Sequence, residues 1–225
     1  MTTDSSDHAP IALRDAESRA DLGTYIGRAK RVDPDGDARL IGHGTVLAAY
    51  VSPLHGVGLP TVLGLRTYAL AQPWDGDVLA SLKALADRLA RTVTPPTLAI
   101  PPVLSTGVAW AGVSPPRSGW EPAGEVRGSV LSATAAAGIA EIAEGAPDGA
   151  GTAAVTRLRA AVWSRTADWS TEAGADVPDG AAFAAETLGF LAGDDDTPVR
   201  VYRHGRWARL STPLGHVLVR QSLLG

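Results

Sequence analysis

The chain has 225 residues, of which 45% are apolar and 20% are charged, and its formal net charge is −4 at pH 7. This composition is ordinary for a globular protein and excludes disordered and fibrous classes. The absence of cysteine excludes disulfides, thiolate nucleophiles and thiolate metal sites, and it favours a cytoplasmic location. The charge gives no general attraction to nucleic acid or anionic lipid, and no sequence window reaches the roughly 18 apolar residues of a membrane span.

Residues 1–10 are polar and acidic, so we expect a disordered tail that lacks the features of a signal peptide. An amphipathic helix is predicted over residues 13–31, and it ends at a turn formed by residues 33–37. Residues 40–51 and 61–70 are rich in β-branched and aromatic residues, which predicts two antiparallel strands.

The middle of the chain alternates between periodic and Pro-rich segments. Apolar residues at helical spacing over 78–93 predict a helix with Asp77 as its N-cap. Residues 95–103 hold four prolines and are expected to be extended. A short buried strand is predicted at residues 108–113, followed by a loop at 114–121.

A helix is predicted over residues 125–144, with Val130, Leu131 and Ile139 among the larger residues of an inner face that is otherwise small. Small residues allow a neighbouring backbone to approach closely, so we expect this helix to be packed on both sides. A further helix around residues 155–162 and a short one at 180–191, capped by Asp179, complete the helical part.

Residues 199–220 show three alternating runs separated by two turn points, which predicts a three-stranded meander. The expected fold class is therefore α+β: an antiparallel β-sheet, made of an N-terminal hairpin and the C-terminal meander, packed with about five helices. We expect one domain over residues 11–225. The alternative arrangement has two lobes, 11–94 and 103–225, joined by a Pro-rich connector at 95–102.

Catalytic signatures are largely missing from the sequence. No complete dinucleotide fingerprint, phosphate-binding loop, nucleophile elbow or helical zinc motif occurs, so no cofactor, metal site or catalytic residue is predicted. The alternative of a hydrolase-type enzyme would use His43 and His55, oriented by Asp75 or Asp77.

The preferred interpretation is a non-catalytic module that binds a small molecule or a protein. A loop near a sheet edge that carries a guanidinium beside an indole suits an anionic or aromatic ligand, and several tryptophans in one half are typical of a core or a ligand pocket. The candidate ligand-binding residues are Arg117, Ser118, Trp120, Trp110 and His55.

Nucleic-acid binding is a second alternative, because the meander is rich in arginine and contains no acidic residue. With two helices before it, the meander resembles the layout of a winged-helix protein, and its aromatic residues suit stacking on single-stranded bases. The candidate residues are Arg200, Arg203, Arg206, Trp207 and Arg209. However, 18 of the 20 basic residues of the chain are arginine, which is typical of a GC-rich genome and weakens arginine as a sign of recognition.

Overall fold

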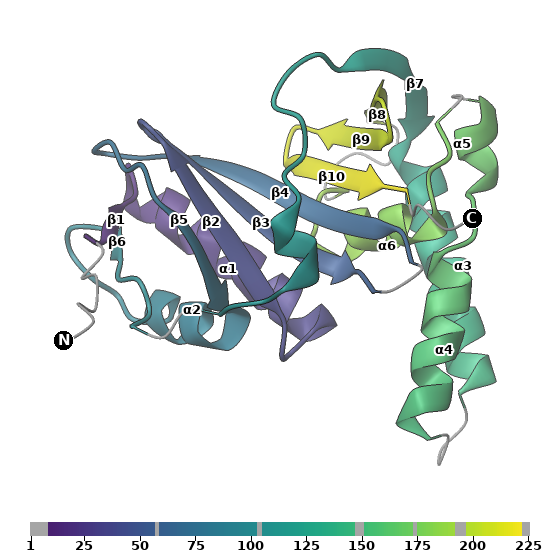
Figure 1. Cartoon of the computed structure of the whole chain (residues 1–225), viewed down its shortest axis with the longest axis horizontal. Coiled ribbons are helices and arrows are strands. Elements are labelled where there is room, and N and C mark those ends of the chain that lie inside the picture. Colours follow the sequence, from purple (N-terminus) through teal and green to yellow (C-terminus); the bar gives the residue numbers. More distant parts are fainter. Residues whose placement is uncertain are drawn as a thin grey trace. The chain divides into compact units, whose positions relative to one another are not determined.

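The computed structural model describes residues 9–56, 59–102, 105–146, 151–172, 175–191 and 197–221, so most of the predicted tail lies outside the described residues. Antiparallel β-sheet and six α-helices make up the described part, which confirms the predicted α+β class (Figure 1). The chain divides into two compact units. The first unit contains Met1–Val51 and Leu65–Ala111, and the second contains Ser52–Gly64 and Gly112–Gly225.

The first unit is a small sheet covered by helices. Its elements are β1 (Ile11–Ala12), α1 (Ala16–Val32), β2 (Asp37–His43), β3 (Val46–Leu54), β4 (Thr61–Ala69), β5 (Asp77–Ser81), α2 (Leu82–Leu89), β6 (Thr97–Leu98) and the 3-10 helix η1 (Ala109–Gly112), of which β3 and β4 also contribute residues to the second unit. The main strands lie in the order β5, β2, β3, β4, and β1 pairs with β6. The fully buried Tyr25 of α1 donates a hydrogen bond of 3.5 Å to the carbonyl oxygen of Ala49, so α1 lies on this sheet.

Three sequence predictions in the first unit are wrong. Residues 40–51 are not one strand, because β2 and β3 form a hairpin whose first turn residue is Gly44, with φ of +57°. Glycine at that position is typical of the type II′ turn, which matches the twist of antiparallel strands.

The predicted helix at residues 78–93 begins only at Leu82, because residues 77–81 pair with β2 as strand β5. Ser81 is the N-cap, and its hydroxyl accepts a hydrogen bond of 3.2 Å from the amide of Ala84. Asp77 instead binds Arg39 at 2.6 Å. The strand predicted at residues 108–113 is also wrong, since the chain there forms η1, which buries Trp110.

The second unit combines the meander with a helical layer. Its further elements are β7 (Glu121–Arg127), α3 (Gly128–Gly145), α4 (Thr152–Trp163), α5 (Asp168–Glu172), α6 (Asp179–Thr187), β8 (Pro198–His204), β9 (Trp207–Thr212) and β10 (Gly215–Arg220). The strands lie in the order β10, β9, β8, β7, which confirms the predicted meander. Helix α6 packs on α3, α4 and β10, and it thereby joins the helical hairpin α3–α4 to the sheet (Figure 1).

The predicted helix at residues 125–144 begins three residues later, because residues 121–127 pair with β8. Leu131 is fully buried, but Val130 and Ile139 are 38% and 45% exposed, so the predicted inner face is only partly correct. Close packing at a small residue is confirmed at Gly138, where a Cβ would lie 2.3 Å from the ring of Trp163. Asp179 is the first residue of α6, and no side chain caps that helix.

Candidate ligand pocket

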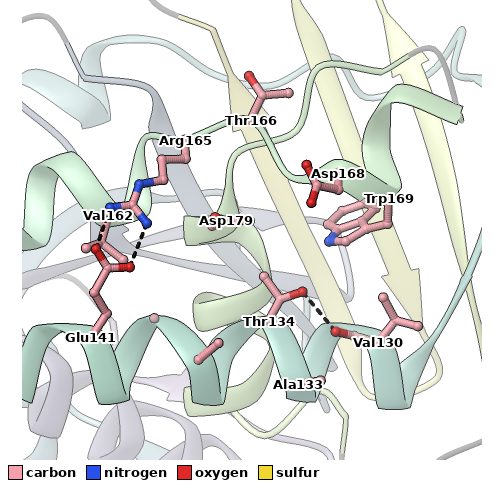
Figure 2. A pocket seen from close by; sticks show the side chains of 12 residues that line it. Val130, Ala133, Thr134, Glu141, Val162, Arg165, Thr166, Asp168, Trp169 and Asp179 are labelled. Atoms are coloured by element: carbon pink, nitrogen blue, oxygen red, sulfur yellow. Dashed lines mark hydrogen bonds and ion pairs between the residues drawn. The ribbon is translucent and has the colours of Figure 1, made fainter.

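A pocket of about 670 Å³ lies in the second unit among helices α3, α4, α5 and α6 (Figure 2). Ligand pockets typically have volumes of a few hundred to about 1,000 Å³ and combine apolar walls with a few polar groups. The lining residues come from all four helices and the α4–α5 link: Val130, Ala133, Thr134, Ala137, Gly138, Glu141, Val162, Arg165, Thr166, Asp168, Trp169 and Asp179.

An ion pair forms one end of the pocket. Two nitrogens of the Arg165 guanidinium donate to the two carboxylate oxygens of Glu141, at 2.6 and 2.5 Å. This hydrogen bonding lowers the pKa of Glu141 and raises that of Arg165, so both groups stay charged at neutral pH. The amide of Asp179 donates to the carbonyl oxygen of Arg165 at 2.8 Å, which fixes the start of α6 beside the pair.

Two more carboxylates line the pocket. In Figure 2, Asp179 lies between the ion pair at one end and Asp168 and Trp169 towards the other. Burial raises the pKa of Asp179, the positive charge of Arg165 opposes that shift, and the negative charges of Asp168 and Glu141 add to it. The ionised form of Asp179 is therefore destabilised in the folded chain.

Trp169 contributes an unsatisfied donor. Its indole Nε1 is buried and has no hydrogen-bond acceptor in the described part of the chain. The neighbouring Ser170 is fully buried, and its hydroxyl oxygen lies 2.7 Å from the carbonyl oxygen of Ala167 and 3.1 Å from the amide nitrogen of Val177. These bonds hold the turn that carries Trp169, so the indole is positioned by the backbone around it.

The remaining wall is small and apolar. Ala133 and Ala137 lie one helical turn apart on α3 and are both exposed, with Val130 nearby on the same helix. The hydroxyl of Thr134 donates to the carbonyl oxygen of Val130 at 2.9 Å and is thus already used within the helix. The small side chains leave the space that the pocket occupies.

The ligand-binding residues predicted from the sequence lie elsewhere. Arg117 and Ser118 are exposed, and Trp110 belongs to the first unit. The indole of Trp120 donates to the carbonyl oxygen of Pro116 at 3.1 Å. His55 is exposed at the end of β3. None of the five lines the pocket, and their proposed role in binding stays a prediction.

Most of the arginines predicted to contact nucleic acid have partners within the chain. Arg200 and Arg203 lie 3.6 and 3.4 Å from the carboxylates of Glu125 and Glu121 on β7. Arg206 donates to the carbonyl oxygen of Gln221 at 2.6 Å, and Trp207 is half-buried.

Arg209 and Trp120, which belong to different predicted sites, meet in the second unit. The guanidinium carbon of Arg209 lies 4.7 Å from the ring centre of Trp120 and 4.5 Å from that of Tyr202. Burial lowers the pKa of this guanidinium, and the two aromatic faces compensate for part of the lost hydration. The pair therefore holds the loop before β7 on the meander.

The carboxylates expected to orient His43 or His55 have other partners. Asp75 accepts a hydrogen bond of 2.9 Å from the amide of Gly44, and Asp77 binds Arg39. Among the described residues, no group of three or more His, Asp or Glu is arranged to hold a metal ion.

The pocket is not apparent from the sequence, because the patterns of its lining residues indicate packing. Asp179 was interpreted as a helix cap, and the alanines of α3 were interpreted as a contact surface. Arg165 and Glu141 are 24 positions apart, and single-sequence patterns do not show that such residues meet. Trp169 is one of the several tryptophans of the second half, and an indole beside Asp168 in a short polar segment is the one local signal in the sequence.

Two models of domains of unknown function match the chain, one over residues 6–112 and the other over residues 115–224. No curated protein matches the sequence. Among solved structures, the DNA polymerase III subunit beta from Pseudomonas aeruginosa is similar, with a TM-score of 0.45 and 11% identity over 91% of this chain and 63% of that chain. The DNA polymerase sliding clamp from Pseudomonas aeruginosa gives a TM-score of 0.46 and 10% identity, over 96% of this chain and 65% of that chain.

This chain therefore spans slightly less than two thirds of the length of either structure. Both TM-scores lie below 0.5, so these likenesses indicate no function for this chain. No helix in the described residues has the length and apolar character needed to span a bilayer.

Proposed function

We propose that the second unit is a non-catalytic module that binds a small organic molecule in the pocket between α3 and α6. The observation that carries this proposal is the buried indole N–H of Trp169 in the lining of a cavity of about 670 Å³. A buried donor without an acceptor costs about 1–3 kcal/mol. Since the Nε1 atom has almost no accessible surface in this structure, a ligand's acceptor recovers part of this free energy when the indole turns towards the cavity.

The chemistry of the lining supports binding rather than catalysis. Among the residues that the structure describes, the lining contains no His, Ser, Cys or Lys, and its two hydroxyl groups belong to Thr134 and Thr166. Thr134 donates to a backbone carbonyl, and Glu141 is held by Arg165. No activated nucleophile beside a general base is therefore described in the lining. The nucleic-acid alternative and the cytoplasmic location stay predictions.

The test fills the pocket with a larger side chain on α3. Ala137→Phe places a ring in the cavity at an exposed position, whereas Ala136→Phe places the same ring on the same helix outside the lining. A small-molecule library is screened by thermal shift, and binding is then measured by calorimetry. We expect compounds that raise the Tm of the wild type and of Ala136→Phe but not that of Ala137→Phe.

A screen without any stabilising compound contradicts the proposal. So does a set of compounds that stabilise all three proteins equally, because their site would lie outside the pocket.

A further inference from the structure

The two sides of the C-terminal meander differ sharply in chemistry. On the core side, alternate residues of β8, β9 and β10 are at most 7% exposed: Val199, Val201, Ala208, Leu210, Val217 and Val219. The other side, which we call the outer face, belongs to the strands drawn in yellow in Figure 1. The strand register arranges its residues in three rows: Arg200–Ser211–His216, Tyr202–Arg209–Leu218 and His204–Trp207–Arg220.

The outer face has three arginines and no acidic residue of its own strands. Arg209 and Arg220 have no carboxylate partner among the residues that the structure describes. Arg200 lies 3.6 Å from Glu125 on β7, and both side chains are more than half exposed. An exposed pair of this kind contributes little to stability and is screened by salt, so a phosphate can take the place of the carboxylate.

The third row combines a cation with an accessible aromatic ring. Trp207 is half-buried between the exposed His204 and the half-buried Arg220. In the described part of the chain, its indole makes no contact with another ring or with a cation, whereas the rings of Trp120 and Tyr202 are both occupied by Arg209. Trp207 therefore offers a surface on which a planar group can stack.

The occupant that suits both features is a polyanion with exposed planar groups. An arginine guanidinium matches phosphate geometry, and an unpaired base stacks on an indole. A duplex hides the faces of its bases, and an acidic peptide offers charge without stacking groups. The high arginine content of the chain explains how often arginine occurs, but it does not explain why three arginines share one face without an acid from the same strands.

We infer that the outer face of the meander binds single-stranded nucleic acid, with Arg200 and Arg220 contacting phosphates and Trp207 stacking on a base. Leu218 is only 2% exposed, so the chain covers the middle row at β10, and the contacts fall on the first and third rows. None of the residues of this face lines the pocket, so the inference does not depend on the proposed binding of a small molecule.

The experiment measures the fluorescence anisotropy of a labelled oligothymidine of about 12 nucleotides with the full chain, between about 50 and 200 mM salt. The variants are Arg220→Gln, Trp207→Leu and Trp207→Phe, of which the last keeps an aromatic ring. Arg159→Gln is the matched control, because Arg159 is exposed on α4 and its loss changes the net charge equally. A duplex of the same length and polyglutamate serve as competitors.

We expect the wild type to bind the oligonucleotide with an affinity that falls as salt rises. Arg220→Gln should weaken binding by about fivefold and reduce the slope of log K against log salt by about 0.7, the effect of one phosphate contact on a single strand. Trp207→Leu should weaken binding by about tenfold, and Trp207→Phe should restore part of it. Arg159→Gln and the pocket-filling Ala137→Phe should bind like the wild type.

Four results would overturn the inference. They are no binding at the lowest salt, an affinity without a salt slope, competition by polyglutamate or duplex equal to that by unlabelled oligothymidine, and equal weakening by Arg220→Gln and Arg159→Gln. The third result would leave a surface without preference for unpaired bases, and the fourth would reduce the effect to net charge. None of the four bears on the pocket, whose own test uses Ala137→Phe and small molecules.

Discussion

At the scale of single residues, Asp179 links the charge of the pocket lining to stability. Its carboxyl is partly buried at the start of α6 and lies among other carboxylates, and its pKa is raised. A raised pKa in the folded chain means that this group's contribution to stability is fully present below its usual pKa of 3.8 and is lost as the pH rises through the folded value. At neutral pH the protein therefore tolerates an unfavourable ionised group in its pocket.

We predict that Asp179→Asn is more stable than the wild type at neutral pH and that this gain disappears near about pH 3, where both side chains are neutral. Urea denaturation at several pH values measures the difference in the free energy of unfolding. Glu144→Gln, at an exposed position of α3 outside the pocket lining, provides the control and should show no comparable gain. A constant difference at every pH, or a loss of stability that is largest at neutral pH, contradicts the prediction.

The residue types in the sequence indicated some of the side chains that take part in contacts and missed others. The predicted importance of Trp120 and Arg209 reflects a real contact, but each had been assigned to a different ligand, and in the structure they bind each other. Arg165 and Glu141 were not singled out, because their meaning depends on a contact between a residue on α3 and one after α4. A single sequence shows which side chains have useful chemistry, but it does not show which of them share a cavity.

At the scale of elements, Arg19 joins three segments of the first unit. Arg19 is only 8% exposed, and its guanidinium donates to the carbonyl oxygens of Arg88, Leu89 and Thr97, at 2.8, 3.0 and 2.9 Å. The first two carbonyls belong to the last turn of α2, where helical donors run out, and that of Arg88 also accepts from the amide of Arg91 at 3.4 Å. Arg19 of α1 thus caps α2 and ties it to β6.

We predict that Arg19→Ala lowers the free energy of unfolding by about 3 kcal/mol, because truncation removes three hydrogen bonds to carbonyl oxygens from a largely buried charged donor, at about 1–3 kcal/mol each. Arg19→Lys should recover only part of this loss, since an ammonium lacks the planar fork that reaches three carbonyls. Arg14→Ala removes an exposed arginine just before the same helix and should change stability by less than about 0.5 kcal/mol. An equally small effect of Arg19→Ala in urea denaturation would show that the hydrogen bonds of Arg19 are dispensable for stability.

Helices and strands were predictable where the spacing of apolar residues and the positions of glycine and proline indicated the same element. The meander was predicted correctly because Gly205 marks its first turn, Pro213 and Gly215 mark its second, and the strands alternate cleanly. The segment at residues 77–81 was mistaken for a helix because Val78 and Leu82 fit a helical spacing, yet pairing with β2 determines its structure. Strand β7 was missed for a related reason, since its mostly exposed residues carry no apolar alternation and its ladder to β8 is non-local.

At the scale of the whole molecule, the two matched models and the two compact units divide the chain differently. The models meet between residues 112 and 115, close to where the second unit resumes at Gly112. However, Ser52–Gly64 lies within the first model and belongs to the second unit. This segment contains the end of β3 and the start of β4. Its residue Leu54 packs against Gly180 of α6, and a Cβ atom added to that glycine would lie only 2.8 Å from the Leu54 side chain. The second unit therefore takes part of its core from the sequence of the first half.

We predict that a fragment of residues 113–225 does not fold cooperatively by itself. It lacks Leu54, Val62 and Leu63, which are at least nine-tenths buried in the full chain, and exposure of such side chains costs about 1.5–3 kcal/mol each, a large part of the stability of a domain this small. Co-expression with a fragment of residues 1–112 should restore a cooperative urea transition, and the two fragments should purify together, because the missing segment is then supplied in trans. Tryptophan fluorescence and near-UV circular dichroism report the transition, and the full chain serves as the reference. A fragment 113–225 that unfolds with the same midpoint as the full chain would show that Ser52–Gly64 contributes little to the second unit and that the boundary between the two models is a true domain boundary.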